Sequence, residues 1–139
     1  MKLTWNGHSC FTLEAEEGTL VLDPYGDGQV PGLAPLRLTA QQKDRLHRVD
    51  VLMLPVGGYC TISAHEARTL ATPLFPRIII PMHYRSATSG YRFGYDELGL
   101  LGNFTAVCPR ESLVYYKGST MEITKHTPGQ TAILTYCPG

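Results

Sequence analysis

The sequence predicts one domain that mixes α-helices and β-strands. The chain has 139 residues, which is long enough to bury a core without disulfides or metal ions. Its first part shows the period-two alternation of β-strands, and two continuous apolar runs follow, separated by a helical pattern. Strands followed by a strand-helix-strand unit are typical of a mixed domain, so we assign residues 1–139 to one α/β (α+β) domain.

Three short strands are expected at the amino terminus. Lys2–Asn6 and Cys10–Ala15 alternate around the Gly7-His8-Ser9 turn, and Thr19–Asp23 follows a second turn. This pattern predicts an antiparallel meander. Residues 24–35 are too rich in proline and glycine for a helix or a strand, so we expect an irregular loop there.

The middle of the chain is expected to hold two helices and two buried strands. Thr39 and Ser63 each have Gln or Glu three residues later, which predicts capping boxes and helices over about residues 40–48 and from Ser63 to about Ala71. The runs Val51–Val56 and Arg77–Pro81 lack a polar face, as is typical of strands covered on both sides. A right-handed crossover would make these two strands parallel neighbours.

The last part of the chain is expected to add a short helix and several short strands. The helix begins near Asp96 and carries Leu98 and Leu101. No repeat and no linker interrupts the sequence, which supports a single domain. The expected strands are Thr105–Cys108, Leu113–Lys117, Met121–Thr124 and Ala132–Tyr136.

Charge and composition exclude several function classes. The 12 basic and 12 acidic residues cancel and are scattered, so the chain lacks the basic patch of a nucleic-acid or anionic-membrane binder. No apolar run approaches the length that spans a bilayer, and Met1 is not followed by a secretion signal. We therefore expect a cytoplasmic protein whose four cysteines, which form no CxxC pair, are reduced and partly buried.

His83 is the strongest candidate for chemistry. It follows the apolar run Ile78–Ile80, so it would stand at the carboxyl end of a strand, where open α/β sheets bind ligands. His8 lies in the first turn, and Asp23 ends the third strand. Each residue also has a structural interpretation: both histidines could be hydrogen-bonded within the fold, and Asp23 could cap a loop.

A candidate anion site follows the first buried strand. Gly57 and Gly58, with Tyr59 and Thr61, lie between this strand and a helix N-terminus, where free N–H groups suit a phosphate or carboxylate of a substrate. The alternative is a close-packed turn, since Ser63 already caps the helix. The remaining histidines have no partner at ligand spacing and are expected to be solvated; they are His47, His65 and His126.

Four segments occur in an order that resembles a known fold. They are Trp5-Asn6-Gly7-His8-Ser9-Cys10-Phe11, Leu22-Asp23-Pro24-Tyr25, Leu54-Pro55-Val56-Gly57-Gly58 and Ile80-Pro81-Met82-His83-Tyr84. In this order they resemble the metallo-β-lactamase fold, and the branch that includes ascorbate-6-phosphate lactonase is the most similar. The resemblance implies part of an αββα sandwich with mixed sheets. It also implies a metal-dependent hydrolase that acts on ester-like or phosphorylated small molecules.

The motif that carries most metal ligands in that family is absent. The family binds its metals mainly through HxHxDH, and this sequence contains no such motif. The resemblance makes His83 a ligand for zinc, manganese or iron, with His8 and Asp23 beside the pocket. Because a hydrolytic metal needs at least three protein ligands, we expect this chain to be inactive. We interpret the gap as a deletion, natural or engineered, joined near residues 38–40.

Other functions remain open. The chain could be a non-catalytic binding or interaction module of the same fold, or a small α/β scaffold without that ancestry. It could also be an active hydrolase whose metal site is completed across an oligomer. Loss of a central block would open faces and edges of the sheet, and such edges recruit partners, so we expect a homo-oligomer. The expected partner of an active form is a small-molecule substrate, with neither nucleic acid nor membrane.

Overall fold

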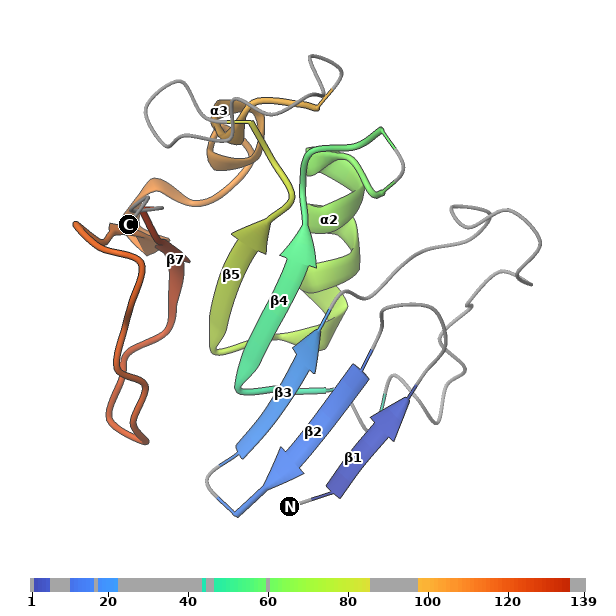
Figure 1. Ribbon diagram of the computed structural model, residues 1–139, viewed down its shortest axis with the longest axis vertical. Helices are drawn as coiled ribbons and strands as arrows, with labels where there is room; N and C mark the ends of the chain where they lie inside the picture. Colours follow the sequence, from blue (N-terminus) through green and yellow to red (C-terminus); the bar gives the residue numbers. More distant parts are fainter. Residues whose placement is uncertain are drawn as a thin grey trace.

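A mixed β-sheet organises the part of the chain that the structure describes (Figure 1). This computed structural model describes residues 2–5, 11–16, 18–22, 44, 47–59, 61–85 and 98–135. Within them the strand order is β1-β2-β3-β4-β5-β7-β6, which confirms the expected α/β class. Two predicted features lie outside the described residues: the loop at 24–35 and the junction at 38–40. Of the first expected helix, at about 40–48, the structure describes only residues 44, 47 and 48.

The amino-terminal strands form the predicted antiparallel meander. β1 (Lys2–Trp5) pairs with β2 (Phe11–Ala15), and β2 pairs with β3 (Gly18–Leu22). Gly18 begins β3 with a φ of +148°, and a Cβ atom at this position would collide with the carboxylate of Asp50. Only glycine therefore fits the point where the meander approaches the next strand.

Two parallel strands form the centre of the sheet. β4 (Val51–Pro55) pairs with β3 on one side and with β5 (Ile78–Met82) on the other. Successive side chains of a strand point to opposite faces, and here both faces are buried. The two predicted buried runs are thus confirmed. Leu52, Leu54 and Ile79 pack on one face, and Val51, Ile78 and Ile80 pack on the other.

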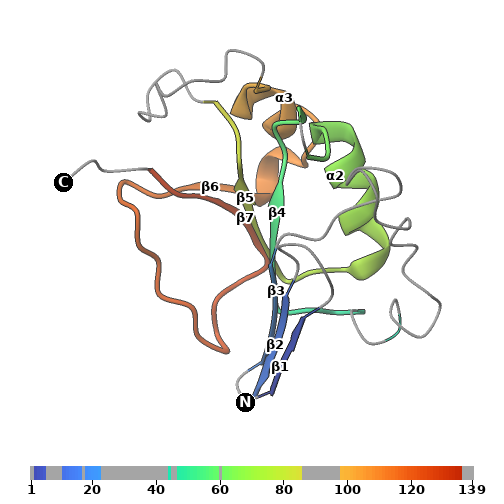
Figure 2. The same cartoon turned by 45° about the vertical axis from the view of Figure 1, so that its right-hand side comes forward.

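The helix between β4 and β5 covers one face. α2 (Ala64–Ala71) begins at the predicted capping box, in which the Glu66 carboxylate accepts a 2.7 Å hydrogen bond from the backbone N–H of Ser63. It buries Ala67 and Ala71 and continues into the 3-10 turn η1 (Thr72–Leu74). Figure 2 shows the sheet nearly edge-on, with α2 and α3 on one side and the connection between β6 and β7 on the other.

The carboxyl-terminal part differs from the sequence prediction in three places. It forms α3 (Leu101–Thr105), the 3-10 turn η2 (Arg110–Ser112), β6 (Leu113–Tyr115) and β7 (Gln130–Ile133). The predicted strand Thr105–Cys108 is wrong, because Phe104 and Cys108 are buried four residues apart, which is a helical spacing. The short helix itself begins later than expected.

The predicted strand Met121–Thr124 is also wrong. Thr127 and Thr124 hydrogen-bond each other in a local turn, and the guanidinium of Arg77 binds the carbonyl oxygen of Thr124. A side chain has therefore taken the place of a strand partner. Met121 still packs, with Tyr116, on the sheet face that α2 leaves open. No helix among the described residues is long and apolar enough to cross a membrane.

One carboxylate connects four segments at the amino ends of β4 and β5. Asp50 accepts a 3.1 Å hydrogen bond from the backbone N–H of Thr19 and a 3.1 Å bond from Nε of Arg77. Nη1 of Arg77 donates in turn to the carbonyl oxygens of Thr124 and Thr127, at 3.1 and 2.6 Å. The meander, the central strands and the turn before β7 are thus joined through a single ion pair.

Replacing Asp50 with alanine should destabilise the fold. Asp50→Ala removes two charge-assisted hydrogen bonds, and since both side chains are partly exposed we expect a loss of about 1–2 kcal/mol in the free energy of unfolding. Urea titration at pH 7 measures this loss. Asp50→Asn keeps one acceptor and should lose less, and Glu122→Ala, at an exposed carboxylate, should change stability by less than about 0.5 kcal/mol. An unchanged urea midpoint for Asp50→Ala would contradict this role.

Candidate functional site

His83 stands directly after β5, at the carboxyl end of the central strands. Its side chain is exposed, and its φ of +52° is in the left-handed region that residues other than glycine seldom adopt. The backbone before it is fixed, because the N–H of Val56 donates to the carbonyl oxygen of Met82 at 3.1 Å. The sheet therefore presents this histidine at the edge where α/β folds bind ligands.

The hydroxyl of Thr61 contacts both the loop backbone and the ring of His83. Oγ1 of Thr61 donates to the carbonyl oxygen of Gly58 at 2.9 Å and lies 3.2 Å from Nδ1 of His83. A hydroxyl has only one proton, so the contact with His83 requires Nδ1–H to donate to Oγ1. Nε2 then keeps its lone pair. This is the tautomer in which a histidine binds a metal through Nε2 while its other nitrogen is held by a neighbour.

The Gly57-Gly58 loop packs closely against the His83 segment. A Cβ atom on Gly57 would collide with the carbonyl oxygen of His83, and Gly58 has a φ of +69°. The N–H groups of Gly58 and Thr61 donate within the loop, to Ile62 and Gly58. These contacts explain the glycines as a close-packed turn. Binding of an anion by Gly57, Gly58, Tyr59 and Thr61 stays a prediction.

A groove of about 320 Å³ opens between the start of α2 and α3. No sequence pattern predicts its α3 side, because that wall depends on two backbone hydrogen bonds: Gly99 N–H to the Gly57 oxygen at 2.7 Å, and Arg85 N–H to the Gly99 oxygen at 3.0 Å. Gly57 lies both in this groove and against His83, so the groove adjoins the histidine. Its lining residues are Val56, Gly57, Ser63, Ala64, His65, Gly99, Asn103 and Val107.

The described residues do not complete a metal site. Among them no three His, Cys, Asp or Glu side chains gather at a distance that would hold a metal ion. His8 and Asp23, the other two predicted ligands, lie outside the described residues. His47, His65 and His126 are exposed, as expected. Of the three predicted ligands, the structure therefore places only His83.

Burial raises the pKa of two side chains, Tyr84 and Cys108. It raises the pKa of the Tyr84 hydroxyl, so this side chain is protonated and can donate a hydrogen bond at neutral pH. Burial also raises the pKa of the Cys108 thiol, although Arg68 and the hydroxyl of Thr131 oppose the shift. Cys108 is a free and buried thiol, as the sequence predicted, and its raised pKa makes it a poor nucleophile.

Comparison with known proteins supports the same fold. The family model described as a Beta-lactamase superfamily domain matches residues 31–83 and so ends at His83. A structure from Thermotoga maritima, described as one of the metallo-β-lactamase superfamily, superimposes with a TM-score of 0.59. It is 21% identical, and the match covers 95% of this chain and 97% of that one. The structural likeness shows the fold, and the sequence match to the superfamily covers residues 31–83.

Within that superfamily the sequence matches the UPF0173 metal-dependent hydrolases. A UPF0173 protein of Pyrococcus abyssi is 34% identical over 70 residues, which are 50% of this chain and 33% of that protein. A UPF0173 metal-dependent hydrolase of Caldivirga maquilingensis is 45% identical over 42 residues, which are 30% of this chain and 18% of that protein. The matches therefore span one third or less of the length of these relatives.

A methyl group at Gly57 should disturb the edge that carries His83. We expect Gly57→Ala to lower the free energy of unfolding by about 1–3 kcal/mol, because its Cβ would overlap backbone that cannot rotate away. Gly102→Ala on α3 is the matched control: no atom lies within 4 Å of its Cβ, and alanine favours a helix, so stability should rise by about 0.5–1 kcal/mol. Urea titration of both variants compares them. Equal stability of Gly57→Ala and the wild type would contradict the close packing.

Proposed function

We propose that this chain is part of a metal-dependent hydrolase of the metallo-β-lactamase superfamily, in which His83 supplies one metal ligand through Nε2. The observation that carries the proposal is the Thr61 hydroxyl on Nδ1 of His83, since it leaves Nε2 as the free lone pair. Two further findings support it. His83 stands at the carboxyl edge of the central strands, and the superfamily match includes it.

We also propose that the chain alone does not hydrolyse its substrate. A bound zinc, manganese or iron ion would supply an activated water and polarise the ester, but this requires three protein ligands. The described residues supply His83 only, and the sequence has no HxHxDH motif. The donor set does not fit a complete site, so no catalytic step is assigned. The proposed substrate class is a small phosphorylated or lactone-like ester, as in the branch of ascorbate-6-phosphate lactonase.

The missing ligands could come from a second copy of the chain. β6 is an edge strand of only three residues, and its Val114 and Tyr115 are 39% and 63% exposed. Exposed apolar edges recruit partners, so we propose a homo-oligomer formed at this edge. A deletion near residues 38–40 would explain the absent ligands, and the source locus would then encode this chain without HxHxDH. The remaining alternative is a binding module of the same fold that never hydrolyses.

Removing the imidazole of His83 should remove the metal. Because a single ligand holds zinc weakly, the samples are dialysed against excess zinc, and we expect about one bound equivalent per chain in the wild type, measured by plasma mass spectrometry, and none in His83→Ala. Thr61→Val keeps the ligand but loses the hydroxyl that orients it, so zinc affinity should fall about tenfold. His126→Ala, at an exposed histidine of the turn before β7, should keep the wild-type metal content.

Two outcomes would each contradict one part of the proposal: the role of His83 as a ligand, or the inactivity of the chain alone. A His83→Ala variant that retains its zinc would show that His83 is not a ligand. Two equivalents per chain, together with turnover of p-nitrophenyl phosphate or a lactone, would show that the chain carries a complete site and is active. Light scattering on the same samples tests the oligomer, and a stable monomer at micromolar concentration would contradict it.

A further inference from the structure

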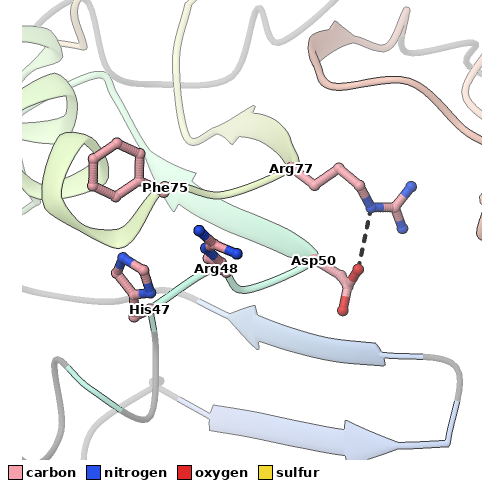
Figure 3. A pocket seen from close by; sticks show the side chains of 5 residues that line it. All are labelled: His47, Arg48, Asp50, Phe75 and Arg77. Carbon is pink, nitrogen blue, oxygen red and sulfur yellow. Dashed lines mark hydrogen bonds and ion pairs between the residues drawn. The ribbon is translucent and has the colours of Figure 1, made fainter.

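A cavity of about 400 Å³ lies at the other end of the central strands from His83 (Figure 3). His47, Arg48 and Asp50 line it from the segment before β4, and Phe75 and Arg77 line it from the segment before β5. The volume is within the range of small-molecule sites. The metal-dependent chemistry proposed above makes no use of this end of the sheet.

The charges in this cavity leave one cation uncompensated. Arg77 and Asp50 form an ion pair, and Arg77 also binds two backbone carbonyl oxygens. The exposed side chain of Arg48 makes no hydrogen bond or ion pair within the described part of the chain. Figure 3 shows its guanidinium between the His47–Phe75 pair and the Asp50–Arg77 pair. The cavity therefore offers a free guanidinium, which binds phosphate or carboxylate through two parallel hydrogen bonds.

An aromatic ring lies beside that cation. The side chain of Phe75 is 65% exposed, and its ring meets the ring of His47 at a centroid distance of 5.5 Å and an interplanar angle of 65°. This edge-to-face contact holds the phenyl ring in place without covering it. A planar group of a ligand could therefore stack on Phe75 while its anionic group reaches Arg48.

Arg48 and Phe75 both have a left-handed backbone conformation, which glycine adopts more easily. Phe75 ends η1 with a φ of +47°, and Arg48 has a φ of +61°. The N–H of Arg48 donates to the carbonyl oxygen of Leu74 at 2.7 Å, so the two strained positions are held next to each other. Glycine is the usual residue at such positions. Two large side chains are present instead, and both line the same cavity.

We propose that this cavity binds a small molecule in which an anionic group is attached to a planar ring. Arg48 binds the anion, and the phenyl ring of Phe75 stacks on the planar part. Asp50 and Arg77 form the polar wall, and their opposite charges compensate each other. The anion can be the phosphate of a nucleotide or a carboxylate on an aryl ring, because a guanidinium binds both groups in the same way.

Four probes separate the contributions to binding by isothermal titration calorimetry on the full chain. AMP carries phosphate and ring, benzoate carries carboxylate and ring, adenosine lacks the anion, and inorganic phosphate lacks the ring. We expect saturable binding of AMP, benzoate or both, at least about tenfold tighter than adenosine, since a charge-assisted pair contributes a factor of this order. A fifth probe, phenyl phosphate, has the same ring as benzoate, so the tighter of these two shows which anionic group the cavity prefers.

Two variants that relieve the backbone strain test the residues without loss of the fold. Arg48→Gly should weaken binding of the tighter probe at least about tenfold. Phe75→Gly should weaken it about fivefold while leaving binding of inorganic phosphate unchanged, because only stacking is lost. Arg110→Ala, which removes an exposed arginine on η2, should bind as the wild type does.

The proposal is overturned by any of three results. Neither AMP nor benzoate saturates the wild type by about 10 mM, which corresponds to negligible affinity for a site of this kind. Arg110→Ala weakens binding as much as Arg48→Gly, which would mean that only overall charge attracts the anion. Adenosine binds as tightly as AMP, which would mean that the cavity does not recognise an anion. None of these results bears on the metal site, since His83 is at the opposite end of β5.

Discussion

The position of both candidate sites depends on the carboxylate of Asp50. It binds the N–H of Thr19 at the start of β3 and Nε of Arg77 just before β5. These two bonds hold the beginnings of β3, β4 and β5 in a fixed register. Parallel pairing then carries this register from Val51–Ile78 at one end of the sheet to Pro55–Met82 at the other. Because the strands are short, an error of one residue at the beginning would separate Gly57 from His83 at the end.

The same register gives the two ends of the sheet different chemistry. At the carboxyl end, backbone groups pack so closely that Gly57 cannot carry a side chain, and His83 is turned outward with Thr61 on its ring. At the amino end, the chain leaves a cavity between the segments that enter β4 and β5. Arg48 and Phe75 occupy left-handed positions there, as His83 does at the other end. Strained backbone at residues with large side chains, found at both ends, is typical of binding sites.

The sequence predicted the elements whose signals are local. The capping box at Ser63 and the two-sided apolar runs of β4 and β5 need only neighbouring residues, and all are found as expected. The prediction of a strand at Met121–Thr124 failed where a distant side chain takes part, since Arg77 binds the carbonyl oxygen of Thr124 from 47 positions away. The residues of the candidate sites also divide into those with a local sequence signal and those that depend on distant contacts. His83 was predicted from its place after a strand, whereas the wall at Gly99 and the cavity at Arg48 arise only from tertiary contacts.

The tautomer of His83 decides how the metal proposal should be understood. If the ring merely filled a structural role, either nitrogen could take the hydrogen bond, and an exposed histidine would gain little from a fixed tautomer. When Thr61 donates its proton to the Gly58 carbonyl oxygen, it accepts from Nδ1, and Nε2 keeps its lone pair. This tautomer is the one in which a histidine binds a cation through Nε2, and one ligand of this kind holds a divalent metal weakly. The geometry therefore fits a chain that contributes one ligand to a site and obtains the others from residues beyond β5 and its loop.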